Sequence, residues 1–335
     1  MKIIYYVTEH GLGHASRTVA IVRDLLRYNV EVIIRNDDPI SFFKKSLPKT
    51  RVVTGETDLK PIMQQKNAMR VDDSKTARSV KKWIQHLPLY LEKESSFVTK
   101  ERPDLIVSDI SVMPILVAKK NHIRSVAISS FVWNETLNID SQIARFLRES
   151  YNEANLVIKL PFGSPMNLQN KRNFGLVARK PTKKRIITRT HLGIQEKEQL
   201  VAVSLSGVGH KLSFKHSKSV KLLDISNYSV ALRSGKINFV EGQNLINAAD
   251  LVICKCGYGF ISECLSCGVK FRYVMEPSHK EAWYVHKELS ELDLHNRISL
   301  SELKSTNLDT EFVENANRIR LHTDNQNVAK ALLRV

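Results

Sequence analysis

Apolar residues in the first half of the chain form short continuous runs, separated by longer stretches with helical periodicity. The runs lie at residues 2–7, 30–35, 51–54, 104–109, 125–130 and 156–160. Continuous apolar runs of this length are typical of parallel strands buried on both faces. The helical patterns lie near residues 14–28, 38–47, 76–100, 111–121 and 135–152. This alternation predicts βαβ units and a doubly wound sheet.

Residues 161–198 interrupt this pattern with Pro161, Gly163, Pro165 and Pro181 and with the basic segment 179–185, which indicates a crossing between domains. Beyond it, the pattern predicts strands at 200–205, 228–233, 237–240, 251–255 and 270–275, and helices near 242–249, 259–267 and 280–291. We therefore predict an α/β protein with two Rossmann-like doubly wound domains that face a cleft. The expected boundaries are 1–165 for the first domain, 166–198 for a linker region, 199–310 for the second domain, and 311–335 for C-terminal helices that pack back on the first domain.

Length and composition agree with two globular domains. The chain has 335 residues, of which 42% are hydrophobic and 25% charged. No apolar run reaches the roughly 20 residues that span a bilayer, and the first residues read as a strand, so we expect a cytoplasmic protein. The net charge of +17 favours an anionic partner, with simple solubility as the alternative. Zinc-finger spacing and RNA-recognition motifs are absent, so no nucleic-acid partner is expected.

All four cysteines lie within fourteen residues, which raises the question of a metal site. Their spacing is C-x-C-x7-C-x2-C, at residues 254, 256, 264 and 267, rather than two C-x2-C pairs. Cysteines on a strand end and on one helix face serve well as small buried hydrophobic residues. We therefore predict structural thiols and no metal site, with metal binding as the alternative.

The first strand runs into a glycine-rich turn that precedes a helix, at residues 9–17. Gly11 and Gly13 allow backbone N–H groups to approach a ligand, but Ser16 replaces the third glycine of the dinucleotide fingerprint. His14 is expected at the mouth of the sheet, where a histidine can serve as a general base. The alternative is a histidine that caps or packs the helix.

A buried strand at 103–109 ends in Ser108-Asp109, which places Asp109 at the same edge of the sheet as His14. A carboxylate against an imidazole fixes its tautomer and raises its basicity. The two residues therefore form a candidate catalytic pair. The alternative is that Asp109 caps the helix starting near Ser111.

The second half contains two further turns suited to phosphate groups. A small-residue turn with Ser206 and Gly207 follows the strand at 200–205. The run 247–263 predicts a strand, a glycine turn and a helix start, whose free N–H groups favour an anion. Its candidate binding residues are Gly257, Tyr258, Gly259, Ser262 and Glu263. Glu263 is placed to accept both hydroxyls of a ribose, the alternative being that it complements the helix dipole.

The chain resembles the GT-B glycosyltransferases, particularly the branch that contains the lipid-linked N-acetylglucosaminyltransferase of peptidoglycan synthesis. It is similar, more closely, to the glycosyltransferase-like N-terminal region of plant arabinokinases and related archaeal proteins. Those proteins carry a G-x-G-H-A-T-R turn like residues 11–17 and a Gly-Tyr-Gly-x-x-Ser-Glu helix start like residues 257–263. The resemblance covers roughly residues 1–290.

This resemblance implies an inverting glycosyltransferase that needs no metal or other cofactor and takes a nucleotide-diphosphate sugar, expected to be UDP-linked, as its donor. It implies that Glu263 binds the donor ribose, and that Ser206, Gly207 and residues 257–259 surround the diphosphate. His279 and Glu281 would approach the donor sugar or the phosphates. His14 would be the acceptor-side base, with Asp109 behind it.

The chain departs from the peptidoglycan enzyme after residues 279–281. That enzyme has an arginine and a pair of glutamines there, whereas this chain has Ala282, Trp283 and Tyr284, so the resemblance does not imply N-acetylglucosamine as the donor sugar. Three other functions stay open: a nucleotide-sugar epimerase or hydrolase of the same fold, a non-catalytic nucleotide-sugar-binding protein, and a basic nucleic-acid binder.

Lysines stand beside aromatic residues in two predicted helices of the first domain, as in Phe42-Phe43-Lys44-Lys45 and around Trp83 in 79–100. Such a pattern suits a surface that is apolar below and meets anionic lipid above. By analogy with the peptidoglycan enzyme, we hypothesise peripheral binding at the inner face of the membrane and a lipid-linked or membrane-near acceptor. The alternative is that the aromatic residues pack into the core while the lysines are solvated.

Overall fold

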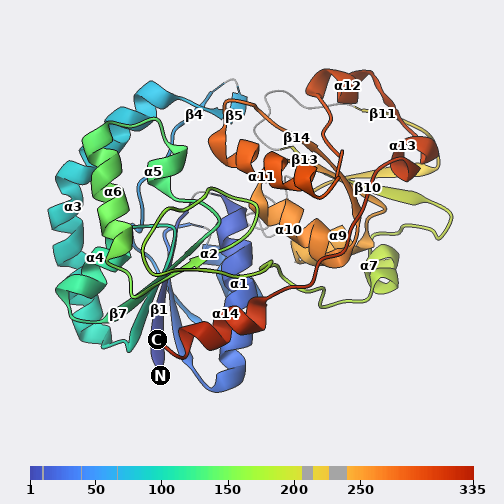
Figure 1. Ribbon diagram of the computed structural model, residues 1–335. Coiled ribbons are helices and arrows are strands. Elements are labelled where there is room, and N and C mark those ends of the chain that lie inside the picture. Colours follow the sequence, from blue (N-terminus) through green and yellow to red (C-terminus); the bar gives the residue numbers. More distant parts are fainter. Residues whose placement is uncertain (10, 39, 66, 206–213, 226–239) are drawn as a thin grey trace. The chain divides into compact units, whose positions relative to one another are not determined.

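The computed structural model describes residues 1–335 except 10, 39, 66, 206–213 and 226–239 (Figure 1). The chain forms two compact units, each with its own parallel sheet. The first unit comprises residues 1–62, 71–177 and 323–335, and the second comprises residues 63–70 and 178–322.

The first unit contains a sheet of seven parallel strands. Their spatial order is β3 (Arg51–Val53), β2 (Glu31–Arg35), β1 (Lys2–Val7), β6 (Leu105–Asp109), β7 (Arg124–Ser129), β8 (Leu156–Lys159) and β9 (Lys171–Asn173). The central strands β1 and β6 are almost wholly buried. This burial explains why their sequences read as continuous apolar runs.

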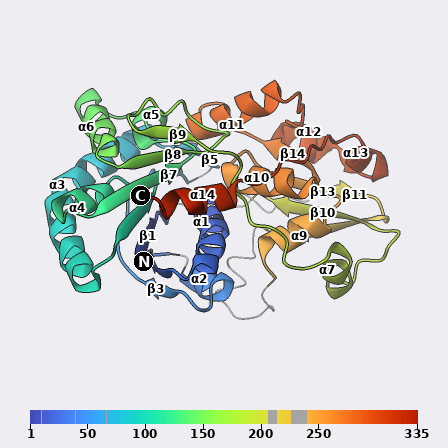
Figure 2. The same cartoon turned by 60° about the horizontal axis from the view of Figure 1, so that its bottom comes forward.

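Helices cover both faces of this sheet (Figures 1 and 2). They are α1 (Leu12–Leu25), the 3-10 helix η1 (Leu26–Tyr28), α2 (Ile40–Ser46), α3 (Asp73–Glu101), α4 (Met113–Lys120), α5 (Trp133–Thr136), α6 (Ser141–Asn152) and α14 (Asn325–Leu332). Ile4 and Tyr6 pack in one core cluster with residues of α3, α4 and α6. Because successive strand residues point to opposite faces, the buried Ile3 and Tyr5 face the other layer, where α14 packs on α1.

Local sequence signals explain the long helix α3. The Asp72 side chain accepts a hydrogen bond from the Lys75 N–H at its start, and Arg102 ends it in the left-handed conformation, with a φ of 51°. A buried ion pair then fixes α3 against the sheet, because Arg35 of β2 donates two hydrogen bonds to Glu94. Tyr6 donates a third hydrogen bond to the same carboxylate at 3.1 Å, so the charge is fully satisfied.

The second unit is built on four parallel strands, in the order β12 (Val220–Asp224), β10 (Gln199–Ser204), β13 (Leu251–Lys255) and β14 (Lys270–Val274). Its helices are α7 (Arg185–His191), α9 (Gly242–Ala248), α10 (Tyr258–Cys267), α11 (Lys280–Glu291), α12 (Leu300–Ser305) and α13 (Thr310–Glu314). Two short pairs complete the structure, β4 (Met63–Gln64) with β5 (Asn67–Val71), and β11 (Lys215–His216) with β15 (Asn307–Leu308).

The structure confirms the predicted α/β class with parallel sheets. Residues 166–177, expected in the linker region, belong to the first unit because β9 pairs with β8. Residues 63–70, expected in the first domain, belong to the second unit, where Met69 packs in the core. Residues 323–335 belong to the first unit, in line with the expectation that C-terminal helices pack back on the first domain. The predicted strand at 228–233, and nearly all of the one at 237–240, lie outside the described residues.

The turn that leaves β8 provides a stability test of the first unit. A Cβ atom added to Gly163 would lie 1.6 Å from the Ser130 carbonyl oxygen, which is main-chain and cannot rotate away. We expect Gly163→Ala to lower the free energy of unfolding by about 1–3 kcal/mol or more. Gly257→Ala is the matched control, because a Cβ there meets nothing within 4 Å. Urea unfolding of both variants tests this, and equal stability would contradict it.

Candidate functional site

The first unit has one point where its strand order reverses. From β1 the chain continues to β2 and β3 on one side, and it then returns to β6 on the other side of β1. Ligands of open α/β sheets bind beyond the carboxyl ends of the strands at such a switch point. The residues that follow β1 and end β6 therefore mark the candidate site. These residues are His14, near the start of α1, and Asp109, the last residue of β6.

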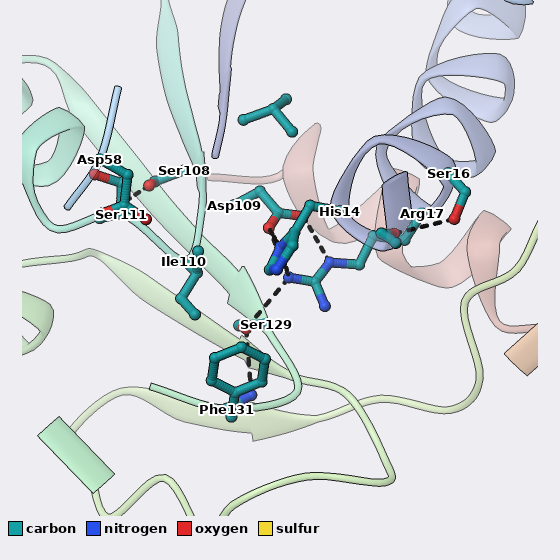
Figure 3. Close-up of polar contacts among 12 residues, drawn as sticks. His14, Ser16, Arg17, Asp58, Ser108, Asp109, Ile110, Ser111, Ser129 and Phe131 are labelled. Carbon is teal, nitrogen blue, oxygen red and sulfur yellow. Dashed lines mark hydrogen bonds and ion pairs between the residues drawn. The ribbon is translucent and has the colours of Figure 1, made fainter. Parts of the chain in front are cut away.

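His14, Asp109 and Arg17 form a buried cluster at this point (Figure 3). His14 Nδ1 lies 2.6 Å from Asp109 Oδ1. Arg17 donates to both oxygens of the same carboxylate, from Nε to Oδ2 and from Nη2 to Oδ1, each at 2.6 Å. Arg17 also donates to the Ser129 hydroxyl at 3.3 Å. The predicted proximity of His14 and Asp109 is found, with an arginine clamp that the sequence reasoning did not assign.

The two ring nitrogens of His14 have different surroundings. Nδ1 lies 2.6 Å from Asp109 Oδ1, an acceptor, and 2.7 Å from Arg17 Nη2, a donor. Nε2 has no hydrogen-bond partner in the described part of the chain. The edge of the ring contacts Phe131, with ring centroids 6.0 Å apart. His14 thus presents one ring nitrogen, Nε2, that no neighbour occupies in the described part of the chain.

Opposing effects act on the Asp109 carboxyl. Burial alone would raise its pKa, but the adjacent Arg17 guanidinium, and then His14, lower the pKa below its usual value. Asp109 therefore stays ionised. The alternative role as a helix cap is excluded, because α4 begins at Met113 and its N-cap residue is Val112.

Backbone geometry on both sides fixes this cluster. Gly11 precedes α1 with a φ of 85°, a conformation that favours glycine, and so starts the helix that carries Gly13, His14 and Arg17. Ile110, directly after Asp109, has a φ of 65°, which is a strained conformation for a β-branched residue. The Tyr151 hydroxyl donates to the Ile110 carbonyl oxygen at 2.6 Å and helps hold this turn.

A second buried carboxyl lies beside this turn, at Asp58 (Figure 3). It accepts hydrogen bonds from the Trp133 indole N–H at 2.9 Å and from the Leu59 N–H at 2.8 Å. Burial raises the pKa of Asp58 to about 7, although its hydrogen bonds lower it. The sequence gives no periodic or motif signal for this residue.

The second unit has its own switch point, between β10 and β13. The predicted residues Ser206 and Gly207 follow β10 but lie outside the described residues. After β13, Gly257 is the N-cap residue of α10, and no side chain caps this helix end. Tyr258 and Ser262 are buried, and Ser262 bonds to the Gly259 carbonyl oxygen at 3.0 Å. The start of α10 thus has no side-chain cap, and N–H groups at a helix start favour an anion.

Glu263, predicted from the sequence to bind a ribose, is a buried carboxylate with a partner from another segment. It is only 3% exposed, and Arg179 donates to both of its oxygens, from Nε at 2.6 Å and from Nη2 at 3.2 Å. Arg179 comes from the basic segment that we interpreted as a linker. A buried carboxylate at this depth requires such a partner. The position of Glu263 one turn into α10 gave no sign in the sequence of this arginine partner.

The remaining predicted residues of this unit lie at the start of α11. His279 is the N-cap residue, and its Nδ1 accepts a hydrogen bond from the Ala282 N–H at 3.3 Å. Glu281 lies in the first turn of the helix. The sequence reasoning missed Lys255, at the carboxyl end of β13, where burial lowers the pKa of the ammonium group. Its position two residues before Gly257 was the available signal.

The cysteines lie on β13, on the turn after it and on α10. Burial raises the pKa of Cys254 to about 12 and that of Cys267 to about 11, so these thiols are protonated. Cys256 donates to the Ala282 carbonyl oxygen. In the described residues, no group of three or more His, Cys, Asp or Glu side chains is arranged to hold a metal ion.

The aromatic residues of the hypothesised membrane surface are buried. Phe42, Phe43 and Trp83 are at most 7% exposed, and Trp83 lies against Tyr90 with ring centroids 6.4 Å apart. These rings belong to the interior of the first unit, so this pattern does not support a membrane surface. Among the described helices, none combines the length and apolar character needed to cross a bilayer.

Solved structures with a similar fold are glycosyltransferases. The glycosyltransferase of kitacinnamycin matches with a TM-score of 0.59 and 16% identity, over 99% of this chain and 94% of its own. SsfS6 from Streptomyces sp. SF2575 matches with a TM-score of 0.57 and 12% identity, over 100% and 96%. UGT89C1 from Arabidopsis thaliana matches with a TM-score of 0.57 and 10% identity, over 99% and 93%. These likenesses define the fold class, GT-B.

Sequence comparison gives the family. Residues 1–187, more than half of the chain, match the family described as glycosyl transferase family 1. The chain belongs to this family of glycosyltransferases. It is also 26% identical over 305 residues to L-arabinokinase from Arabidopsis thaliana, across 85% of this chain and 29% of the relative. The chain thus spans less than a third of the length of that relative.

The buried Asp58 carboxyl predicts how stability depends on pH. Its folded pKa of about 7 lies above the unfolded value of about 3.9, so the folded state binds the extra proton. This contribution to stability is fully present below about pH 4 and is lost as the pH rises through 7. Between pH 5 and pH 8, the free energy of unfolding of the wild type should therefore fall more than that of Asp58→Asn. The difference between the two falls should be on the order of 2–4 kcal/mol.

Urea unfolding followed by tryptophan fluorescence measures this difference, because Trp83 and Trp133 both lie in the first unit. Glu149→Gln, an exposed change on α6, is the control and should follow the wild type. Parallel pH profiles for Asp58→Asn and the wild type would contradict the assignment.

Proposed function

We propose that this protein is an inverting, metal-independent glycosyltransferase that moves a sugar from a nucleoside-diphosphate sugar to an acceptor hydroxyl. The observation that carries the proposal is the pairing of His14 with Asp109 at the switch point of the first sheet, with Nε2 of the imidazole unoccupied. A base in this state can take a proton from a hydroxyl group.

The proposed reaction is a single displacement. The acceptor hydroxyl gives its proton to His14 Nε2 while its oxygen forms a bond to the anomeric carbon. The bond from that carbon to the diphosphate breaks, and its electron pair leaves with the phosphate oxygen, so the configuration inverts. Asp109 holds the Nδ1 proton throughout, and Arg17 keeps Asp109 ionised.

The second unit offers the features that a departing diphosphate needs. The uncapped start of α10 supplies N–H donors and the positive end of a helix dipole, and half-buried Lys255 lies directly before it. These groups can balance the phosphate charge without a metal ion. Among proteins of similar fold, SsfS6 has been solved with thymidine diphosphate and UGT89C1 with UDP-L-rhamnose.

Glu263 is proposed to bind the donor ribose together with Arg179. Each carboxylate oxygen accepts one hydrogen bond from Arg179 and retains a lone pair for a ribose hydroxyl. In this arrangement Arg179 orients the carboxylate, so both residues contribute to one donor subsite.

The test of the function begins with a panel of UDP-, TDP- and GDP-sugars and hydroxyl acceptors, each assayed with EDTA present. We expect transfer with inverted anomeric configuration, observed by NMR, and no loss of rate in EDTA. His14→Ala should lower kcat by about 10²–10⁴-fold, because it removes the general base, while donor affinity changes little.

Ser129→Ala is the control for this series, because it removes the hydrogen bonds that the hydroxyl accepts from Arg17 and from the Phe131 N–H but leaves the His14–Asp109 contact in place. Release of free sugar or of an epimer without an acceptor would identify a hydrolase or an epimerase instead. Tight donor binding without turnover, or a His14→Ala variant of full activity, would contradict the proposed mechanism.

The proposed donor subsite allows the effect of Glu263 on the free energy of unfolding to be separated from its effect on nucleotide binding. Glu263→Ala leaves Arg179 as an uncompensated buried charge and should destabilise the protein by about 3–5 kcal/mol. The double variant Arg179→Met/Glu263→Leu replaces the pair by apolar side chains of similar size and should recover most of that stability. Neither variant should bind the donor nucleotide, because both lack the carboxylate.

Urea unfolding and calorimetry with the nucleotide identified in the panel measure the two quantities separately. If the double variant regained wild-type nucleotide affinity, Glu263 would be a structural residue only.

A further inference from the structure

Beyond the proposed function, we infer that the first unit carries a second ligand site, which binds a compact organic polyphosphate. The site is a cavity of about 590 Å³ at the amino-terminal edge of the sheet, within the usual volume range of small-molecule sites. Arg124 and Leu156, which begin β7 and β8, line it on one side. Lys330 and Arg334, from α14 and the residues just after it, line the other.

Positive charge is concentrated in this cavity. Arg124, Arg172, Lys330 and Arg334 all contribute to the lining, and no acidic side chain does so in the described residues. Arg124 donates to the main-chain oxygen of Val335, which also lines the cavity. None of the four has a carboxylate side chain as an ion-pair partner among the described residues. All four side chains are exposed, and a bound anion would reduce the repulsion among them.

The chemistry of the lining favours phosphate groups attached to an organic part. Three arginines present planar forks of donors that match phosphate oxygens, and Lys330 adds a point charge. The half-buried Phe174 ring and the Leu156 side chain add apolar surface, and three asparagines add amide donors and acceptors. An inorganic anion would use only the charged part of this lining.

This cavity is distinct from the site around His14. Strand β7 connects the two, because Arg124 at its start lines the cavity and Ser129 at its end accepts from Arg17. A strand of six residues places these ends roughly 17 Å apart. A bound polyphosphate would also join α14 to the sheet, since Lys330 belongs to the helix and Arg172 to β9.

Calorimetry and thermal unfolding of the full chain with ATP and with inorganic pyrophosphate, at fixed ionic strength, test this inference. Arg172→Gln/Lys330→Gln removes two cations from the cavity. Lys44→Gln/Lys49→Gln is the matched control, which removes the same charge from exposed positions of the same unit that do not line the cavity. We expect the ATP dissociation constant to rise by about ten-fold or more in the cavity variant, and little in the control.

The increase in the thermal unfolding temperature on adding ATP should disappear in the Arg172→Gln/Lys330→Gln variant. Because the double variant Arg179→Met/Glu263→Leu removes the donor subsite and is expected to keep most of the stability, ATP binding to the cavity should persist in it. Loss of binding in that double variant, or equal weakening in the cavity and control variants, would overturn the inference. Weaker binding of pyrophosphate than of ATP supports the organic part of the ligand, and equal binding would overturn that part.

Discussion

The buried carboxylate of Asp109 can be tolerated because Arg17 meets both of its oxygens. Moving a single ion into a protein interior costs several kcal/mol, which only a well-oriented partner can offset. Arg17 and His14 are three residues apart and therefore lie on the same face of α1. The ion pair thus fixes the rotation of α1 relative to β6, and with it the 2.6 Å contact between His14 and Asp109.

Local strain surrounds this ion pair. Ile110 turns the chain away from the sheet in a conformation that costs on the order of 1–3 kcal/mol for a residue of its type. The hydrogen bond from Tyr151 and the surrounding buried network of Asp58 and Trp133 hold the segment in place. Strained, over-determined backbone of this kind concentrates at functional sites, so its position next to Asp109 agrees with a site there.

Much of the first unit could be predicted from the sequence, because its strands are buried on both faces and stand out as apolar runs. The meeting of His14 and Asp109 followed from two strand ends at one edge of a parallel sheet. The partner of Glu263 could not be predicted in this way, because Arg179 is 84 residues away and no periodicity connects the two residues. The burial of Trp83 was equally hidden, since a helix pattern places an aromatic residue on a face without saying what covers it.

The charge of the cluster constrains the proposed reaction. Asp109 and Arg17 neutralise each other, and the proposed mechanism starts with His14 as a neutral base, so in that mechanism the cluster carries no net charge before transfer. A proton taken from the acceptor adds a positive charge in a buried setting, and Asp109 cannot fully offset it because Arg17 already engages both oxygens. In the proposed reaction, the negative charge that develops on the leaving diphosphate is the remaining compensation. The proposed mechanism therefore couples proton uptake by His14 to the breaking of the sugar–phosphate bond, and it disfavours deprotonation of the acceptor in the absence of donor.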